Sequence, residues 1–271
     1  MKNLVIAAIC LSICTFEFAQ NGNCAEEEVG QVKANAKNSE DSLSIKQELE
    51  TLSNQSNLKR SKEAKEVMQK SLADLDKSAM VTHVLPVGAY APDFALPNAA
   101  NKIVRLKSLL SKGPVVLTFY RGGWCPYCNL TLRALQKSLP AIEAENASLV
   151  AISPQLPDSS LSTVEKDKLT FEVLSDSGNK VAKQFGIAYE ISSDLNKLYK
   201  EFGIDLAKDN GDESRELPLA ATFVIAKNGS IANVFADVDY KKRMEPADVV
   251  TVLKRIRNED RSRLNWRPVS H

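Results

Sequence analysis

Two cysteines separated by two residues stand near the middle of this chain, in the stretch FYRGGWCPYC. Cys125 and Cys128 enclose Pro126 and Tyr127, and Trp124 directly precedes the pair. Cysteines at this spacing can form a redox-active dithiol, half of a metal site or a structural disulfide. The residues around the pair must decide among these three, and must also decide which sulfur would attack first.

The neighbouring residues favour redox chemistry. A proline suits the first turn of a helix, so Pro126 places Cys125 at or near the N-cap and Cys128 one turn inside. The positive end of the helix dipole and the free amides of the first turn stabilise a thiolate there. Arg121 either supplies further positive charge to the thiols or points to solvent.

The competing site types lack the residues that they need. A zinc site takes four ligands, and the histidines that could join the cysteines are His83, which precedes the main domain, and His271, the last residue. A disulfide across three residues would constrain little of the unfolded chain. No histidine is placed as the base of a cysteine hydrolase, and no glycine-rich phosphate loop is present. We therefore expect a redox dithiol with no metal and no cofactor.

The overall composition excludes a strong electrostatic field. The chain has 271 residues, enough for one or two domains, and its 35 Lys and Arg against 34 Asp and Glu leave a net charge of +1. This balance gives no argument for nucleic acid as a partner. Basic residues gather locally at 254–267, where interspersed acidic residues favour a solvated helix end.

The N-terminal segment resembles an export signal. A lysine at position 2 is followed by the apolar run LVIAAICLSIC, which is too short to span a bilayer comfortably, and polar residues follow. We interpret residues 1–25 as a signal segment with a weak cleavage site, and expect a periplasmic or otherwise extracytoplasmic, disulfide-permissive location. The alternatives are an uncleaved membrane anchor and a misread start. Three cysteines fall in this segment, namely Cys10, Cys14 and Cys24.

The region between this segment and the main domain begins as a polar stretch and continues with a helical pattern. Residues 26–42 are polar and charged, as in a linker. Apolar residues then recur at helical spacing, which predicts one or two amphipathic helices before residue 79. We expect them to pack on the domain surface rather than to form a coiled-coil dimer. The apolar positions are Ile45, Leu49, Leu52, Met68, Leu72 and Leu75.

The main domain, predicted at 80–258 and followed by a basic tail at 259–271, alternates strand and helix patterns. The apolar run 114–120 reads as a buried strand before the cysteines, and a helix follows them to about Pro140. An Asn-Gly turn at 228–229 predicts a hairpin between 221–226 and 230–236. This order predicts one α/β sandwich. The other expected elements are strands at 148–153 and 170–176 and helices near 181–185, 195–202 and 246–256.

Several stretches resemble the thioredoxin superfamily, and most closely a peroxiredoxin-like group related to the alkyl hydroperoxide reductases and thiol-specific antioxidants. GAYAPDFALPNA is similar to the start of peroxiredoxin domains, and FYRGGWCPYCNLTLRALQ is close to the signature of a subgroup with a CxxC motif. AISPQLPDSS and LPLAATFVIAKNG resemble later strands. The resemblance covers about residues 80–258. It implies a thioredoxin-like, three-layer α/β/α sandwich with a central mixed sheet, preceded by a helical extension.

The resemblance also implies an activity. A peroxiredoxin-like antioxidant would reduce hydroperoxides with Cys125 and Cys128, pass through a disulfide between them and be recycled by a thioredoxin-like donor. Trp124, Arg121 and the enclosed Pro126 and Tyr127 would support the cysteines. Two alternatives stay open: a thiol–disulfide oxidoreductase acting on protein substrates, and a non-enzymatic redox switch. The oligomeric state stays undetermined at this point.

The peroxiredoxin pattern Pro-x-x-x-Thr/Ser-x-x-Cys is altered here. Aligned with it, Cys128 takes the peroxidatic position, Cys125 replaces the hydroxyl residue and Arg121 replaces the proline. The alignment thus assigns the attack to Cys128, whereas the helix geometry favours the N-terminal thiol, Cys125. The order of attack remains open on sequence grounds.

A second departure concerns the arginine that completes the peroxide pocket in the family. It would fall near Ala220, where this chain has no arginine, and Arg215 is the nearest substitute along the sequence. Thioredoxins place a cis-proline at about this point, but here the nearest proline is Pro218.

Overall fold

The structure is a computed structural model that describes residues 44–265. The predicted signal segment, the whole polar linker and the last six residues lie outside the described residues, so those interpretations stay predictions. Within residues 44–265, no helix is both long enough and apolar enough to cross a membrane.

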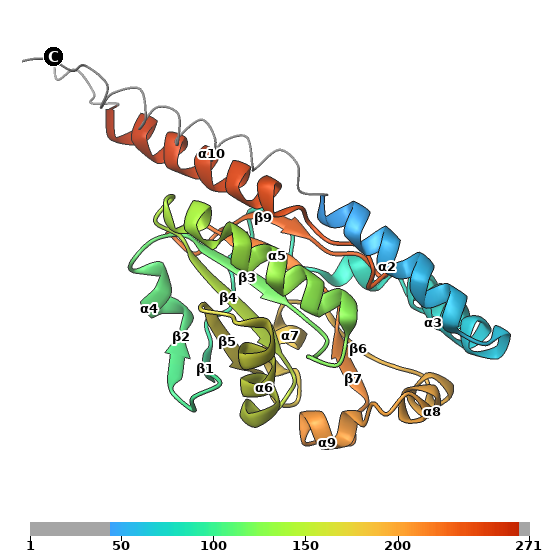
Figure 1. Cartoon of the computed structure of the whole chain (residues 1–271). Coiled ribbons are helices and arrows are strands. Elements are labelled where there is room, and N and C mark those ends of the chain that lie inside the picture. Colours follow the sequence, from blue (N-terminus) through green and yellow to red (C-terminus); the bar gives the residue numbers. More distant parts are fainter. Residues whose placement is uncertain (1–43, 266–271) are drawn as a thin grey trace, which may run out of the picture. The chain divides into compact units, whose positions relative to one another are not determined.

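A five-stranded mixed sheet forms the centre of the domain (Figure 1). Its first three strands in spatial order are parallel, and the last two are antiparallel to their neighbours. Every residue of the central strand is buried, as its continuous apolar sequence predicts. The predicted 221–226 and 230–236 hairpin is also confirmed. In spatial order the strands are β5 (Glu172–Ser175), β4 (Ser148–Ser153), β3 (Val115–Phe119), β8 (Thr222–Ile225) and β9 (Ile231–Phe235).

Each face of this sheet has its own hydrophobic core. Helices α5 (Pro126–Glu143) and α10 (Pro246–Asn265) pack their leucine and valine side chains on one face. Helices α4 (Leu106–Leu110) and α7 (Lys180–Gln184) cover the other, where Phe185 contacts phenylalanines of two strands. The predicted three-layer α/β/α sandwich with a mixed central sheet is therefore confirmed.

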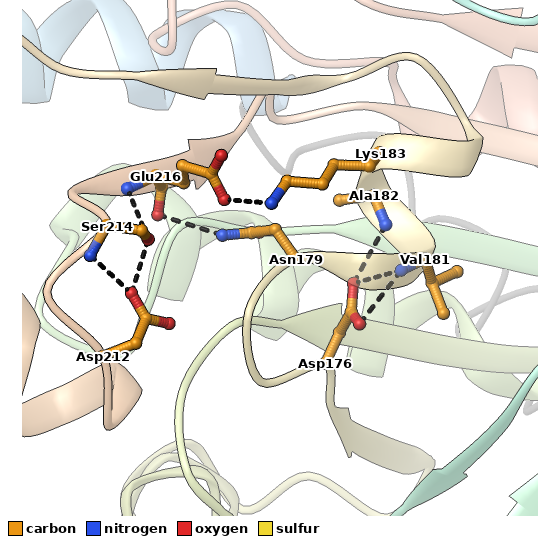
Figure 2. Close-up of polar contacts among 8 residues, drawn as sticks. All are labelled: Asp176, Asn179, Val181, Ala182, Lys183, Asp212, Ser214 and Glu216. Atoms are coloured by element: carbon orange, nitrogen blue, oxygen red, sulfur yellow. Dashed lines mark hydrogen bonds and ion pairs between the residues drawn. The ribbon is translucent and has the colours of Figure 1, made fainter.

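The turn into α7 is held by a polar network that Figure 2 shows. The Asp176 carboxylate accepts hydrogen bonds from the backbone N–H groups of Val181 and Ala182 at 2.9–3.0 Å. Asn179 donates to the carbonyl of Glu216 at 3.0 Å, and Lys183 pairs with the carboxylate of Glu216 at 2.6 Å. Helix α7 is thereby fixed both to the end of β5 and to β7.

The helices differ from the sequence expectation in two ways: some were not expected, and two extend further than expected. Helices α4 and α6 (Pro157–Asp167) are not among the expected elements, although Pro157 occupies the first turn of α6, where a missing N–H costs no hydrogen bond. Helix α5 continues past Pro140, and α10 continues past residue 256 to Asn265. Shorter elements complete the fold: β1 (Ala95–Pro97), β2 (Ile103–Arg105), β6 (Ala188–Glu190), β7 (Glu216–Pro218), α8 (Ser193–Glu201), α9 (Leu206–Asn210) and a 3-10 turn at Met80–His83.

The two predicted N-terminal helices are α2 (Ile45–Lys59) and α3 (Lys62–Lys77). Ile45 and Leu49 of α2 are buried in the core that also contains α5 and α10. Ala64 of α3 is buried in a third apolar cluster, which it shares with residues of α8. Both helices thus pack on the domain, as expected.

Candidate active site

The cysteine pair lies where β3 leads into α5 (Figure 1). Cys125 is the N-cap residue of α5, and Pro126 occupies its first turn. The placement predicted from the proline is therefore confirmed. Both thiols are free, and both are buried, with Cys125 2% and Cys128 0% exposed.

The turn before the cysteines depends on two glycines. Gly122 has a φ of +151°, and a Cβ there would lie 2.3 Å from the indole nitrogen of Trp124. The N–H of Gly123 donates to Oε1 of Gln155 at 2.7 Å, and its carbonyl accepts from Nδ2 of Asn129 at 2.8 Å. These two bonds fix the loop from both sides. They also occupy Asn129, which is the acceptor residue of an Asn-Leu-Thr glycosylation sequon and is buried.

A buried arginine faces the N-terminal thiol. Arg121 is 2% exposed, and its Nη1 lies 4.0 Å from Sγ of Cys125. Its guanidinium carbon sits 5.0 Å from the ring centroid of Trp124, 5.6 Å from that of Tyr199 and 4.3 Å from that of Tyr240. Nη2 also donates a hydrogen bond to the hydroxyl of Tyr199. The aromatic rings stabilise the charge by cation–π contacts, since Arg121 has no carboxylate partner among the ion pairs of the described residues.

A second arginine approaches the other thiol from a distant part of the chain. Arg243, in the loop between β9 and α10, donates from Nη2 to Sγ of Cys128 at 3.5 Å. Its Nη1 donates to the carbonyls of Lys242, at 2.6 Å, and Tyr240. The guanidinium is thus held by its own loop while one nitrogen points at the sulfur.

These contacts shift the pKa values of the two thiols in opposite directions. Burial opposes ionisation of Cys128, but the hydrogen bond from Cys125 and the charges of Arg243 and Arg121 outweigh it and lower the pKa of Cys128 to about 5. Burial and the neighbouring Cys128 raise the pKa of Cys125 well above its ordinary value. The arrangement is one thiolate stabilised by a neutral thiol and two guanidinium groups.

The aromatic residues predicted to support the cysteines lie in the same cluster. Trp124 is half-buried, with its ring centroid 5.5 Å from that of Tyr199. Tyr127 is buried and packs edge-to-face on Tyr240 with centroids 5.5 Å apart. The structure therefore gathers Arg121, Trp124 and the whole Cys-Pro-Tyr-Cys segment at one place.

Arg215, the nearest arginine by sequence to the missing family arginine, lies elsewhere. Arg215 pairs with Glu190, next to the short β6–β7 sheet. Ala220 is a buried residue before β8, and Pro218 ends β7 with a trans peptide, since the described residues include no cis peptide bond. Arg215 is thus not the substitute that sequence proximity suggested. Arg243 and Arg121 provide the positive charge instead.

Sequence reasoning missed four residues of this site: Gln155, Tyr199, Tyr240 and Arg243. No local motif marks them, and Arg243 is 115 positions from the cysteine that it contacts. Only the antiparallel return of β8 and β9 beside β3 brings its loop to the start of α5. No group of three His, Cys, Asp or Glu side chains in the described part of the chain could hold a metal ion.

Known proteins with similar sequences are peroxiredoxins. The AhpC/TSA family model matches residues 87–234. A putative peroxiredoxin bcp from Buchnera aphidicola is 34% identical over 103 residues, which are 38% of this chain and 65% of that protein. A chloroplastic peroxiredoxin Q from Sedum lineare is 32% identical over 163 residues, which are 60% of this chain and 75% of that protein. The chain thus spans just under two thirds of the Buchnera relative.

Solved structures agree on the fold. Peroxidoxin BcpB from Mycobacterium tuberculosis superposes with a TM-score of 0.50 at 24% identity, over 64% of this chain and 98% of that one. At this identity the likeness supports the architecture alone. The matched family region ends at residue 234, before the loop that carries Arg243, and begins after helices α2 and α3.

Proposed function

The chain belongs to the AhpC/TSA family, and on this basis we propose that it is a thiol peroxidase that reduces hydroperoxides through the Cys125–Cys128 dithiol. The observation that carries the proposal is the contact of Arg243 with Cys128, together with the low pKa of that thiol. A thiolate is the nucleophile in such chemistry, and cations beside it also attract the peroxide oxygens. We propose Cys128 as the attacking residue and Cys125 as the residue that resolves the intermediate.

The proposed reaction has two steps. The Cys128 thiolate attacks the distal peroxide oxygen, the O–O bond breaks, and after protonation of the leaving oxygen the products are an alcohol and a sulfenic acid on Cys128. The Cys125 thiol then displaces water from the sulfenic acid, and the S–S bond forms. In sum, a dithiol and a hydroperoxide give a disulfide, an alcohol and water. A thioredoxin-like dithiol would return the pair to the reduced state by exchange.

The direct test is the stoichiometry of this reaction. The fully reduced chain, mixed with one equivalent of hydrogen peroxide or an organic hydroperoxide, is expected to lose one equivalent of peroxide and two thiols. Mass spectrometry should locate the new disulfide at Cys125 and Cys128. Consumption no faster than that of a free cysteine would refute the peroxidase function.

The same experiment separates the alternatives. A CxxC pair at a helix N-terminus also suits exchange with protein disulfides, which is the observation in favour of a thiol–disulfide oxidoreductase. Slow peroxide consumption with fast reduction of a protein disulfide would select that activity. Absence of both, with a disulfide that still titrates, would select a redox switch.

The pH dependence gives a further prediction. Because Cys128 has a pKa of about 5, its reactive thiolate is present above that pH and is lost as the pH falls through it. Alkylation of Cys128 by iodoacetamide should therefore be half-maximal near pH 5 and flat from about pH 6 to 8. Fragmentation of the peptide 122–133 distinguishes Cys128 from Cys125. A midpoint near the ordinary thiol value of about 8.5 would contradict the proposed role of the arginines.

A further inference from the structure

Helix α2, which precedes the matched family region, is fastened to the loop that carries Arg243. Glu245 accepts hydrogen bonds from the first two backbone N–H groups of α2, from Ile45 at 3.1 Å and from Lys46 at 3.0 Å. A carboxylate at this position caps the helix and complements its dipole. Glu245 stands two residues after Arg243, and it is held by two backbone amides that are 200 and 199 positions away in sequence.

Glu245 acts at a junction between three elements. Its carbonyl accepts from Asp248 and Val249, so its backbone begins α10 while its side chain begins α2. Met244, between Arg243 and Glu245, is buried in the core cluster that includes both active-site cysteines and Leu49 of α2. The loop is thus held through the buried side chain of Met244 and through the bonds of Glu245 to α2, and in this arrangement Nη2 of Arg243 lies 3.5 Å from Sγ of Cys128.

The same helix forms one wall of a cavity that Arg243 lines. The cavity measures about 490 Å³ and lies between α2 and the loop after β9. Leu49 and Phe235 supply apolar surface, and Lys46 and Glu50 add charges from α2. If α2 moved away, Arg243 would face open solvent instead of this cavity, and water would compete with the sulfur for its N–H groups.

We propose that Glu245 is a positioning residue, which holds Arg243 against Cys128 by fastening the first turn of α2 to the start of α10. The proposal rests on the proposed function, since it assigns α2 a part in the peroxidase site. Helix α2 is then an element of the active site and not merely an attachment to the domain surface.

The direction in which the titration of Cys128 moves distinguishes two roles of Glu245, the positioning of Arg243 and a direct effect of its own charge. Loss of the negative charge of Glu245 would by itself favour the Cys128 thiolate and move its titration to lower pH. Loosening of Arg243 moves it to higher pH. The Glu245→Gln change leaves every other charged or titratable side chain near Cys128 and the loop in place, namely Cys125, Tyr120, Arg121, Tyr189, Tyr199, Tyr240, Lys46, Glu50, Asp237, Asp239, Lys241 and Lys242.

The test measures the pH profile of Cys128 alkylation in the full chain. Arg243→Gln should lower the rate at pH 5 about fivefold, which corresponds to a titration about one unit higher. Glu245→Gln should lower it at least about twofold, in the same direction. Because Glu245 acts through Arg243, the Glu245→Gln change should not raise the titration further in the Arg243→Gln background. Ser61→Ala, which removes the cap of the neighbouring helix α3, serves as a matched control and should leave the profile unchanged.

Three results would overturn the proposal: an unchanged or lower titration in Glu245→Gln, an equal shift in the Arg243→Gln background, or an equal shift in Ser61→Ala. Alkylation does not depend on peroxide turnover. A wild-type chain that fails to reduce peroxide, yet shows the shift, would refute the peroxidase function and leave the positioning role of Glu245 intact.

Discussion

Replacement of Cys128 by serine is expected to lower hydroperoxide consumption by at least about a thousandfold, because it removes the nucleophile. Replacement of Cys125 by serine should have a different effect. Cys128 keeps its contact with Arg243 and the nearby charge of Arg121, so the first turnover should proceed, but no partner thiol then resolves the product. Consumption should stop after one equivalent, with a sulfenic acid on Cys128. A dimedone adduct, located by mass spectrometry, measures this intermediate.

The two variants also decide the order of attack. If Cys125 attacks instead, Cys128→Ser will show the single turnover and the dimedone adduct, and Cys125→Ser will be inactive. The serine hydroxyl at position 125 can still donate a hydrogen bond to the Cys128 thiolate, so the substitution preserves most of the electrostatic environment. Equal and slow consumption by both variants and the parent would mean that neither thiol is activated.

Much of this site's scaffold could be predicted from local sequence. The continuous apolar run of β3 predicts a strand buried on both faces, and Pro126 predicts the start of α5 one residue after Cys125. The turn at Asn228 and Gly229 predicts the β8–β9 hairpin. These features depend on residues within a few positions of one another, and so a single sequence contains the information.

The charges around the cysteines could not be predicted in the same way. The sequence leaves two orientations for Arg121, and only the packing of Tyr199 and Tyr240 over it decides in favour of burial. Arg243 reaches Cys128 through the topology of the sheet, which no local pattern encodes. Arg215 was the nearest arginine by sequence to the missing family residue. Distance along the chain was a poor guide, because Arg215 directly precedes β7, which pairs with β6, and its side chain pairs there with Glu190.

The order of attack depends on both the local sequence and the tertiary structure. Helix geometry alone favours Cys125, since it is the N-cap residue. That argument assumes that the helix dipole is the strongest source of positive charge near the thiols. In the structure, Arg243 lies 3.5 Å from Cys128, and a full charge at this distance outweighs the partial charge of a helix terminus. The premise of the helix argument therefore does not hold here, and the assignment of the attack to Cys128 is the proposal that the two serine variants test.

The second large effect expected is on the reduction potential. Oxidation converts the Cys128 thiolate into a neutral disulfide, so the buried guanidinium group of Arg121 and the half-buried one of Arg243 lose their anionic partner. At pH 7 a thiol whose pKa is lowered in this way is already ionised, which favours the dithiol over the disulfide relative to a thiol of ordinary pKa. The disulfide should accordingly be readily reduced, and its potential should lie above the value of about −270 mV typical of thioredoxin.

Arg121→Met is the variant that tests this argument. Methionine is unbranched, flexible and uncharged, and its sulfur suits the surrounding rings of Trp124, Tyr199 and Tyr240. Loss of the buried charge should make the potential about 30 mV more negative in a glutathione redox titration, which corresponds to a tenfold change in the equilibrium. Arg133→Met is the matched control, since Arg133 lies on the same helix as Cys128 but pairs with Asp167.

Thermal unfolding should report the same change independently. A thermodynamic cycle joins oxidation and folding, and the unfolded chain has nearly the same potential in parent and variant. The oxidised form of Arg121→Met should therefore gain about 1.4 kcal/mol of stability over its reduced form, relative to the same comparison in the parent. The reason is that the oxidised parent buries Arg121 without an anion, which is costly, whereas the oxidised variant does not. Two results would show that Arg121 does not affect the reduction potential of the dithiol. One is a potential that is the same in parent and variant, and the other is an equal difference in stability between oxidised and reduced forms in both proteins.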